Sequence, residues 1–355
     1  MKHGRWITHA NVPSPLPSRV TVGDLGEATL ISRIRSRVPP APSWILTSIG
    51  DDGAVFEPAR GTVDVITTDT LVEGTHFDKS FVPSQDIGHK SLAVNLSDLA
   101  AMGATPRVTV LSLILPPTLL ANDLDAILGG ILALADQHNI VLAGGNITST
   151  HGPLVIGMTA LGSVRRRRII SRAGGRPGDE LWVTGDLGAA AAGLDYLQHQ
   201  PTTLIGEHLD MRHCVDRYRR PEPRVRIGML LGRNKVARAG VDLSDGLADG
   251  LRQITSASGT GTIIDGPSLP LDPQTKHWFS KRGLDPLLAA LTGGDDYELL
   301  IAVPRSHRRR LFAISRLTDG VPLTRIGELT EPPSLVLHTP SGNQDLPAGY
   351  QHFNK

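Results

Sequence analysis

The stretch Ile66-Thr67-Thr68-Asp69-Thr70-Leu71-Val72-Glu73-Gly74-Thr75-His76-Phe77 passes from an apolar run to hydroxyls, a carboxylate and a histidine within a few residues. Val63, Val65 and Ile66 favour a buried strand, because β-branched side chains fit a pleated surface. We expect this strand to end near Asp69, and ligands collect at strand ends in α/β folds. The alternative is that Asp69 only makes a turn, since aspartate beside threonine is common in turns.

The composition favours a protein of two domains that acts on small molecules. Its 355 residues exceed a usual single domain. With 36 basic and 35 acidic side chains, a nucleic-acid partner is not expected. The single cysteine, Cys214, excludes a disulfide framework within the chain and fits the reducing cytoplasm. No apolar run approaches the roughly 20 residues that cross a bilayer, and no apolar secretory segment is present, so no membrane association is expected.

Strand and helix patterns alternate along the chain, which predicts an α/β or mixed α+β fold. A glycine-rich polar segment at 171–179 predicts a domain boundary. We therefore expect a flexible extension over residues 1–22, an N-terminal domain over 23–168 and a C-terminal domain over 169–355. The strands on either side of 144–153 are expected to pair antiparallel. The arginine run 165–168 is interpreted as a solvated strand end or linker, because no aromatic residues are interleaved with it.

Carboxylates recur where predicted elements end. Gly50-Asp51-Asp52-Gly53, Asp242-Leu243-Ser244-Asp245 and Gly293-Gly294-Asp295-Asp296 each place two of them beside an apolar run, and Asp98 lies in a helix predicted over 83–102. Each has a simpler explanation as a hairpin turn, a helix cap or a solvated helix end. Taken together they favour Mg²⁺, which prefers hard oxygen ligands and bridges protein carboxylates to phosphates. Phosphoryl transfer needs this arrangement.

Other chemistries lack their sequence patterns. The chain has no Gly-x-x-x-x-Gly-Lys-Ser/Thr loop, no HExxH or CxxC motif and no Gly-x-Ser-x-Gly elbow. The turn Gly185-Asp186-Leu187-Gly188, between a predicted strand and helix, allows either phosphate binding or, more frequently, tight helix packing. A metal-dependent phosphohydrolase and a nonenzymatic nucleotide sensor stay open.

Several stretches resemble, in the same order, the thiamine-monophosphate kinase family, part of the superfamily of aminoimidazole ribonucleotide synthetase and selenophosphate synthetase. The resemblance spans about residues 23–353. It rests on Ile49-Gly50-Asp51-Asp52, Thr68-Asp69-Thr70-Leu71-Val72 with His76-Phe77, Asn95-Leu96-Ser97-Asp98, Pro177-Gly178-Asp179, Asp242-Leu243-Ser244-Asp245-Gly246-Leu247, Gly293-Gly294-Asp295-Asp296-Tyr297-Glu298-Leu299 and Gly349-Tyr350.

The resemblance implies a two-domain fold whose N-terminal domain dimerises through its sheet to give a homodimer. It implies direct transfer of the γ-phosphate of ATP to thiamine monophosphate in thiamine diphosphate biosynthesis, with several Mg²⁺ ions. The implied metal ligands are Asp52, Thr67, Thr68, Asp69, Asp98, Asn146, Asp242 and Asp245, of which Asp69, Asp98 and Asp245 are the implied catalytic residues. The implied ATP-binding residues are Gly145, Asn146, Arg172 and Ser244. The implied residues for thiamine monophosphate are His76, Asp295 and Tyr350.

Two positions depart from the family pattern. Gly144-Gly145-Asn146-Ile147 stands where the family commonly has Gly-Gly-Asp-Thr, so a neutral amide replaces a metal carboxylate. Asp295 stands where a glutamate is frequent. The alternatives are another ATP-dependent enzyme of the superfamily and a nucleotide-binding regulator with impaired catalysis. The superfamily's cysteine-dependent members are disfavoured, since Cys214 lies in mid-chain.

Overall fold

The computed structural model describes residues 16–199, 210–318, 320–331 and 334–349. Contact clustering divides the chain into two compact units. The first contains Met1–Arg60, Thr68–Leu92 and Pro106–Leu161, and the second contains Gly61–Thr67, Ala93–Thr105 and Gly162–Lys355. The predicted extension 1–22 lies mostly outside the described residues. Within its described part, the N–H of Val22 donates to Leu119 O at 2.8 Å.

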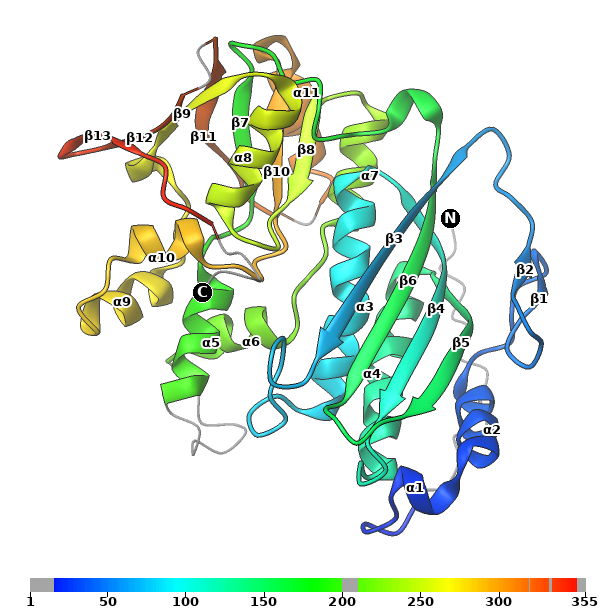
Figure 1. The fold of residues 1–355 in the computed structure, drawn as a ribbon. Coiled ribbons are helices and arrows are strands. Elements are labelled where there is room, and N and C mark those ends of the chain that lie inside the picture. Colours follow the sequence, from blue (N-terminus) through cyan, green and yellow to red (C-terminus); the bar gives the residue numbers. More distant parts are fainter. Residues whose placement is uncertain (1–15, 200–209, 319, 332–333, 350–355) are drawn as a thin grey trace. The chain divides into compact units, whose positions relative to one another are not determined.

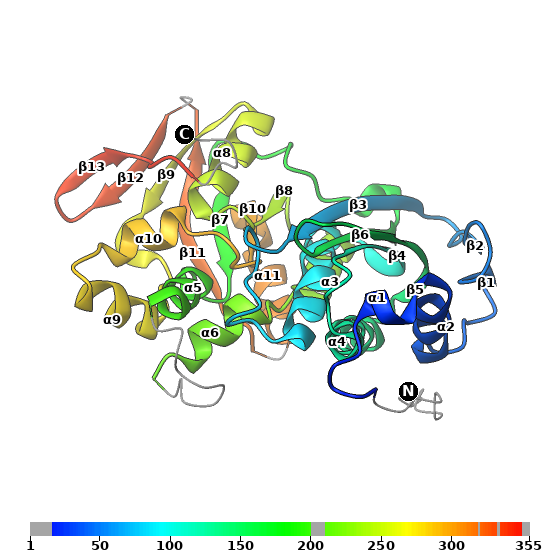
Figure 2. The ribbon, with the colours of Figure 1, turned by 60° about the horizontal axis from the view of Figure 1, so that its bottom comes forward.

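A four-stranded sheet in the order β3-β6-β4-β5 lies against two long helices (Figures 1 and 2). Its strands and helices are β3 (Val63–Val72), β4 (Thr105–Leu115), β5 (Val141–Ser149), β6 (Val155–Val164), α3 (Ser84–Ala101) and α4 (Ala121–His138). The short elements before it are α1 (Val22–Leu25), α2 (Glu27–Arg37), β1 (Ile45–Thr47) and β2 (Val55–Phe56). Gly88 and Gly130 allow α3 and α4 to pack closely. A Cβ at Gly88 would lie 1.8 Å from Ile127 O, and one at Gly130 would lie 1.9 Å from Gln85 O, so no larger residue fits at either position.

Three expectations for this sheet were wrong. Strand β3 continues to Val72, so Asp69 lies inside the strand rather than at its end. The strand is also not buried, since Ile66 is 68% exposed. Strands β5 and β6 are not neighbours, because β4 lies between them and pairs in parallel with β5. Consecutive strands are often adjacent, and here that general tendency misled the prediction.

The second unit contains a seven-stranded sheet in the order β13-β12-β9-β11-β7-β10-β8. It is antiparallel except for the pair β12 and β9. The strands are β7 (Glu180–Thr184), β8 (Ala239–Asp242), β9 (Gly261–Asp265), β10 (Leu299–Val303), β11 (Leu323–Thr330), β12 (Leu335–Thr339) and β13 (Gly342–Asp345).

Helices and 3₁₀ turns complete this unit. They are η1 (Arg166–Arg168), α5 (Ala189–His199), α6 (Arg212–Arg219), α7 (Val225–Arg233), α8 (Leu247–Ser258), η2 (Gly266–Ser268), α9 (Pro273–Lys281), α10 (Pro286–Thr292), η3 (Arg305–His307) and α11 (Arg308–Ser315). Its core is aliphatic and includes Leu181, Val241, Leu251 and Leu300. The mixed α/β fold in two units agrees with the predicted fold class. None of the helices in the described ranges is both long and apolar enough to cross a membrane.

Candidate functional site

In the second unit, four predicted site residues line one cavity of about 510 Å³. They are Thr67 on β3, Asp98 on α3, Arg172 after η1 and Asp242 at the end of β8. The Thr67 hydroxyl donates to the Asp98 carboxylate. The Ser97 hydroxyl donates to Asp242 Oδ2 at 2.8 Å. The structure thus gathers two carboxylates, a hydroxyl and a guanidinium around one cavity. Thr67 and Asp242, the first and last of these residues, are 175 positions apart in the chain.

Burial dominates the electrostatics of this cavity. It raises the pKa of the Asp98 carboxyl, while the Thr67 hydroxyl and the charge of Arg172 lower that pKa only in part. A pKa raised by burial means that the ionised carboxylate is costly in the folded protein. A bound cation would offset that cost. The burial of Asp98 also distinguishes it from the solvated residue at a helix end that the simpler interpretation expects.

Helix capping does not account for the acids after β8. The N-cap of α8 is Gly246, and no side chain caps it. Ser244 and Asp245 therefore stand in the connection between β8 and α8. The N–H of Asp295 donates to Ser244 O at 2.7 Å, which holds the Gly293-Gly294-Asp295 segment against this connection. Asp295 adopts φ +66°, a left-handed conformation, and accepts the Tyr297 hydroxyl at 3.0 Å. The structure brings Ser244 and Asp295 together, although neither lines the cavity of Asp98.

In the first unit, another cavity of about 440 Å³ holds a second group of predicted residues. Its lining includes Asp52, Thr68, Gly145 and Asn146, together with Asp51. Gly145 is required there, because a Cβ would lie 2.0 Å from Leu111 O on the neighbouring strand β4. Asp69 and His76 belong to the same unit but are not among the residues lining this cavity.

An adjoining cavity of about 470 Å³ shares the wall formed by Asp51, Asp52 and residues 144–146. Its other side is apolar and includes Ile31, Ile34 and Leu142. The sequence analysis missed Ile31 and Ile34, which carry no motif. Their only signal was the apolar stripe of α2.

The ring of His76 is held by its own turn. The N–H of Val72 donates to His76 Nδ1 at 3.1 Å, and Lys90 Nζ donates to His76 O at 3.4 Å. Because Nδ1 accepts, the neutral ring carries its proton on Nε2. His76 therefore presents an N–H donor at Nε2. Tyr350, the remaining predicted substrate residue, lies outside the described residues.

The turn Gly185 to Gly188 is occupied by the protein itself. The N–H groups of Gly188 and Ala190 donate to the buried Asp296 carboxylate at 2.8 and 3.4 Å. A Cβ at Gly188 would lie 2.9 Å from the Cβ of Ala290. These contacts support tight packing, the more frequent explanation of such a turn. The N–H groups of Gly188 and Ala190 already donate to Asp296 and are therefore not open to a phosphate.

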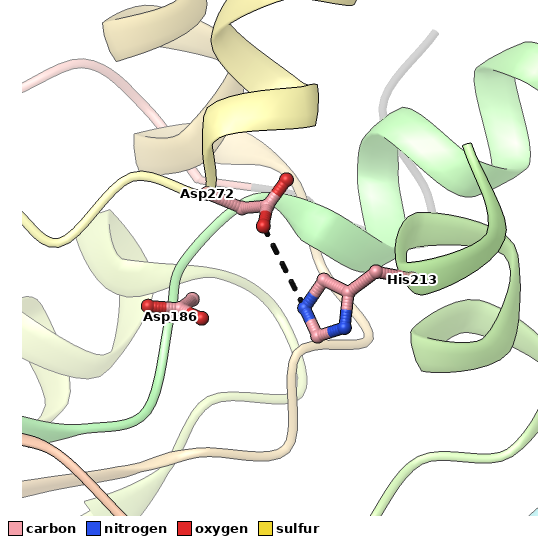
Figure 3. A group of neighbouring side chains, drawn as sticks. All are labelled: Asp186, His213 and Asp272. Atoms are coloured by element: carbon pink, nitrogen blue, oxygen red, sulfur yellow. Dashed lines mark ion pairs between the residues drawn. The ribbon is translucent and has the colours of Figure 1, made fainter. Parts of the chain in front are cut away.

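A group absent from the sequence predictions lies elsewhere in the second unit (Figure 3). Asp186, His213 and Asp272 bring potential ligand atoms within 4.8 Å of one another, the one such group of three in the described ranges. His213 Nε2 lies 3.6 Å from Asp272 Oδ2. Asp272 also caps α9 by accepting the Thr275 N–H at 2.9 Å. The cap and the ion pair account for Asp272 as a structural residue, and no sequence spacing linked the three.

Cys214 beside this group is not a nucleophile. Its side chain is fully buried, and its thiol donates to Asp272 Oδ1 at 3.4 Å. Burial and the neighbouring Asp272 carboxylate raise the pKa of the thiol to about 12. The group is therefore a neutral thiol at physiological pH, and thiolate chemistry is excluded at this cysteine.

Comparison with known proteins gives matches over both units. Residues 50–164 match the N-terminal domain of AIR synthase related proteins, and residues 176–339 match the C-terminal domain. The thiamine-monophosphate kinase of Salmonella typhimurium is 39% identical over 86% of this chain and 90% of the relative. A relative of the same name from Bacillus subtilis is 33% identical over 88% of this chain and 94% of its own length.

Solved structures give the same result. The crystal structure of thiamine-monophosphate kinase from Stenotrophomonas maltophilia has a TM-score of 0.78 and 39% identity, covering 87% of this chain and 95% of the other. A structure described as AaThiL complexed with AMPPCP and TMP has a TM-score of 0.73 and 29% identity, covering 93% of this chain and 98% of the other.

Proposed function

Because this chain belongs to the thiamine-monophosphate kinase family of AIR synthase related proteins, we propose that it phosphorylates thiamine monophosphate with ATP. The products are thiamine diphosphate and ADP. The observation that carries the proposal is the cavity in which Asp98 and Asp242 face Thr67 and Arg172. The AaThiL complex with AMPPCP and TMP supports the same pair of ligands for this chain.

The donor set fits Mg²⁺. Both groups of candidate ligands offer carboxylate and hydroxyl oxygens, Asn146 adds an amide oxygen to one of them, and neither contains a cysteine or histidine. Burial raises the pKa of the Asp98 carboxyl, and a cation held at this carboxylate would offset the cost of ionising it. We assign Thr67, Asp98, Asp242 and Asp245 to one group of ligands and Asp52, Thr68, Asp69 and Asn146 to another. Magnesium bound there would neutralise charge on the phosphate oxygens.

The chain's own residues would orient the reaction. Arg172 presents a guanidinium that can pair with two phosphate oxygens, and Ser244 presents a hydroxyl after β8. We propose that the γ-phosphoryl group passes directly from ATP to the acceptor phosphate in line; Cys214, a buried neutral thiol, would not accept it. Phosphoryl transfer of this kind depends on positioning and electrostatics.

The purine of ATP has a suitable place in the first unit. The apolar wall of Ile31, Ile34 and Leu142 adjoins the polar wall of Asp52 and Asn146. Ligand sites in proteins are mostly apolar with a few placed polar groups. We assign the base to the apolar side and a phosphate to the polar side.

The exposed side chains of the first sheet fit a homodimer. Ile66 on β3 is 68% exposed, and β3 is an edge strand of this four-stranded sheet. An edge strand with an exposed apolar side chain offers a surface for pairing with another chain. We propose that two copies pair through this sheet and that the protein works in the cytoplasm. Sedimentation velocity would give the mass of a dimer, and a monomer at micromolar concentration would contradict the pairing.

Asn146→Asp tests the assignment of the first-unit cavity. The variant restores a carboxylate beside Asp51 and Asp52, which should strengthen Mg²⁺ binding. We expect the Mg²⁺ concentration for half-maximal rate to fall by about three- to tenfold, since an added ligand charge is worth on the order of 1 kcal/mol. The measurement is a Mg²⁺ titration of the rate at saturating ATP. An unchanged titration would contradict the role of residue 146 at a metal.

His76→Ala tests the acceptor side. Loss of the Nε2 donor should raise the KM for thiamine monophosphate by about tenfold, because one hydrogen bond to a charged group is worth roughly 1.5–3 kcal/mol. The KM for ATP should change less than twofold. His76→Gln is the matched variant, since its amide N–H reaches a similar position and should restore part of the affinity. Equal increases in both KM values would mean that His76 only shapes the turn after β3.

The direct test of the function is incubation of the purified protein with ATP, Mg²⁺ and thiamine monophosphate. Thiamine diphosphate and ADP should form in equal amounts. ADP without thiamine diphosphate would favour a hydrolase or another ATP-dependent enzyme of the superfamily. ATP binding without turnover would favour a regulator.

A further inference from the structure

Asp186, His213 and Asp272 come from three separate segments of the second unit (Figure 3). Asp186 lies in the turn between β7 and α5, His213 lies on α6, and Asp272 is the N-cap residue of α9. Each side chain offers one potential ligand atom, and these three atoms lie within 4.8 Å of one another. Two carboxylates and an imidazole that converge in this way form a donor set for a divalent transition metal ion.

The spacing of the donor atoms suits such an ion. Two tetrahedral ligands that are each about 2.0–2.1 Å from a zinc ion lie roughly 3.3–3.4 Å from each other. The distance between His213 Nε2 and Asp272 Oδ2 is 3.6 Å. This distance is long for a hydrogen bond between the two side chains but close to that expected for two ligands of one ion. The His213 side chain is 46% exposed, so an ion can reach it from solvent.

Asp272 uses its two carboxylate oxygens differently. Oδ1 accepts the Thr275 N–H at 2.9 Å and the Cys214 thiol at 3.4 Å. Within the part of the chain that the structure describes, Oδ2 has the His213 ring as its one ion-pair partner. The cap of α9 therefore fixes the carboxylate through Oδ1 and leaves Oδ2 available as a ligand on the side of His213.

The turn that carries Asp186 does not need its carboxylate. In an Asx turn, the carboxylate of residue 186 would accept the N–H of residue 188. The Gly188 N–H instead donates to Asp296 Oδ2 at 2.8 Å, and the Leu187 N–H donates to Pro270 O at 2.9 Å. No hydrogen bond or ion pair joins the Asp186 carboxylate to another residue in the described ranges. Turn geometry therefore does not account for Asp186.

The charges around Asp186 favour a cation. Burial raises the pKa of its carboxyl, and the neighbouring Asp272 carboxylate raises this pKa further, while His213 and Arg217 lower it. Arg217 is already paired with Glu298 at 2.8 Å. The His213 ring is positively charged only when it is protonated. A dipositive ion would therefore stabilise both carboxylates of the group, which the surrounding side chains do only in part.

Close packing holds the three segments in place before any ion binds. A Cβ at Gly193 on α5 would lie 2.1 Å from the backbone oxygen of Cys214, the residue after His213, so α5 and α6 pack tightly. The N–H of Asp272 donates to Leu187 O at 3.4 Å, which ties the start of α9 to the turn of Asp186. Because these segments are already ordered, an ion that binds them costs little conformational entropy.

We propose that Asp186, His213 and Asp272 bind a Zn²⁺ ion at a site separate from the Mg²⁺ ions of the kinase reaction. None of the three residues lines the cavities assigned to ATP and Mg²⁺. An imidazole ligand favours zinc over Mg²⁺, which prefers oxygen ligands. The ion would join the turn between β7 and α5 to α6 and to the start of α9. Three protein ligands would leave a fourth position for water.

Isothermal titration calorimetry with Zn²⁺ tests the proposal. Mg²⁺ is kept in large excess, so that the oxygen-ligand sites of the proposed kinase reaction are filled, and no nucleotide is added. The test variants are Asp186→Asn and His213→Gln. The matched controls are His277→Gln, which removes an exposed histidine of α9 outside the group, and Cys214→Ser, which removes the neighbouring thiol. Thermal unfolding without Zn²⁺ checks that each variant remains folded.

We expect one Zn²⁺ ion per chain in the unmodified protein. Each test variant should bind Zn²⁺ at least about tenfold more weakly, because even changes beside a metal ligand cost about 10- to 100-fold in affinity. The two controls should change the affinity less than threefold. Zn²⁺ should also raise the Tm of the unmodified protein more than that of Asp186→Asn, since an ion that binds only the folded state stabilises it.

Three outcomes would overturn the proposal. The first is no Zn²⁺ binding to the unmodified protein in the presence of Mg²⁺. The second is an unchanged affinity in Asp186→Asn and His213→Gln. The third is an equal loss in a test variant and a control, which would mean adventitious binding to exposed histidines or to the thiol. Because the readout is metal binding without substrates, failure of the proposed kinase activity would not produce any of these results.

Discussion

Replacement of Asp98 by asparagine is expected to reduce the rate of thiamine diphosphate formation by about 10³-fold or more, because loss of charge stabilisation at transferring phosphate costs on the order of 4 kcal/mol. Asp98 lines the cavity with Asp242 and Arg172 and is our proposed ligand for Mg²⁺. Asparagine has the same shape, and its carbonyl oxygen can still accept the Thr67 hydroxyl. The loss should therefore come from charge rather than from misfolding.

The free energy of unfolding of Asp98→Asn should rise although its activity falls. Burial raises the pKa of the Asp98 carboxyl in the folded protein above its unfolded value of about 3.9. The folded state then holds its proton to higher pH, so the free energy of unfolding falls as pH rises from the unfolded to the folded pKa. Asparagine does not ionise. Without Mg²⁺, Asp98→Asn should therefore be more stable than the unmodified protein at neutral pH, and the difference should vanish below pH ~3.5.

Urea unfolding at several pH values, with and without Mg²⁺, measures the free energy of unfolding of Asp98→Asn and of the unmodified protein. The control is Asp136→Asn on α4, an exposed carboxylate that lines none of the site cavities described above. It should change activity less than twofold and stability by no more than about 0.5 kcal/mol. If Asp98→Asn lowers stability at neutral pH without Mg²⁺, Asp98 holds the fold together and its role as a metal ligand is wrong.

The sequence predicted the acids of this site because their chemistry recurs in a recognisable local form. Asp242 was expected after an apolar strand and before a helix, and in the structure it is the last residue of β8, with α8 starting at Leu247. Asp98 lies on α3, as the apolar spacing of residues 83–102 indicated. The position of Asp242 at a strand end and that of Asp98 on a helix both depend on residues close to them in the chain, and a sequence displays those residues directly.

What the sequence could not predict depends on partners far away in the chain. The length of β3 is an example: its threonines and Asp69 look like a strand end, but they continue a strand whose neighbour is β6. Pairing with another strand supplied the hydrogen bonds that a turn would otherwise have provided.

Glu298 is a residue of the quoted motif whose role is structural. Its side chain is fully buried and accepts hydrogen bonds from Thr184 Oγ1 at 2.6 Å, Arg217 Nη2 at 2.8 Å and Arg224 Nε at 2.7 Å. Arg217 also donates to the backbone oxygen of Asp296 at 2.6 Å. The carboxylate thus joins β7, α6, the start of α7 and the Gly-Gly-Asp-Asp segment within the second unit.

Glu298→Gln should lower the free energy of unfolding by about 3–5 kcal/mol, because removing one partner of a buried pair leaves uncompensated buried charge. Two arginines lose their shared carboxylate in this variant. Glu222→Gln is the matched control, since Glu222 contacts the same Arg224 at 2.8 Å but is 64% exposed at its side chain. An exposed ion pair contributes only about 0–1 kcal/mol, so this control should change little.

Urea unfolding measures both free energies, and hydrogen exchange at the amides of β7 and β10 shows whether the loss lies in the second unit. Those amides should exchange faster in Glu298→Gln and be unchanged in Glu222→Gln. The KM for ATP of the fraction that remains folded should stay within twofold, because Glu298 lines none of the three cavities assigned to ATP and Mg²⁺. A loss below 1 kcal/mol in both variants would mean that the arginines find other partners, and that the acid of this motif is retained for substrate rather than for the fold.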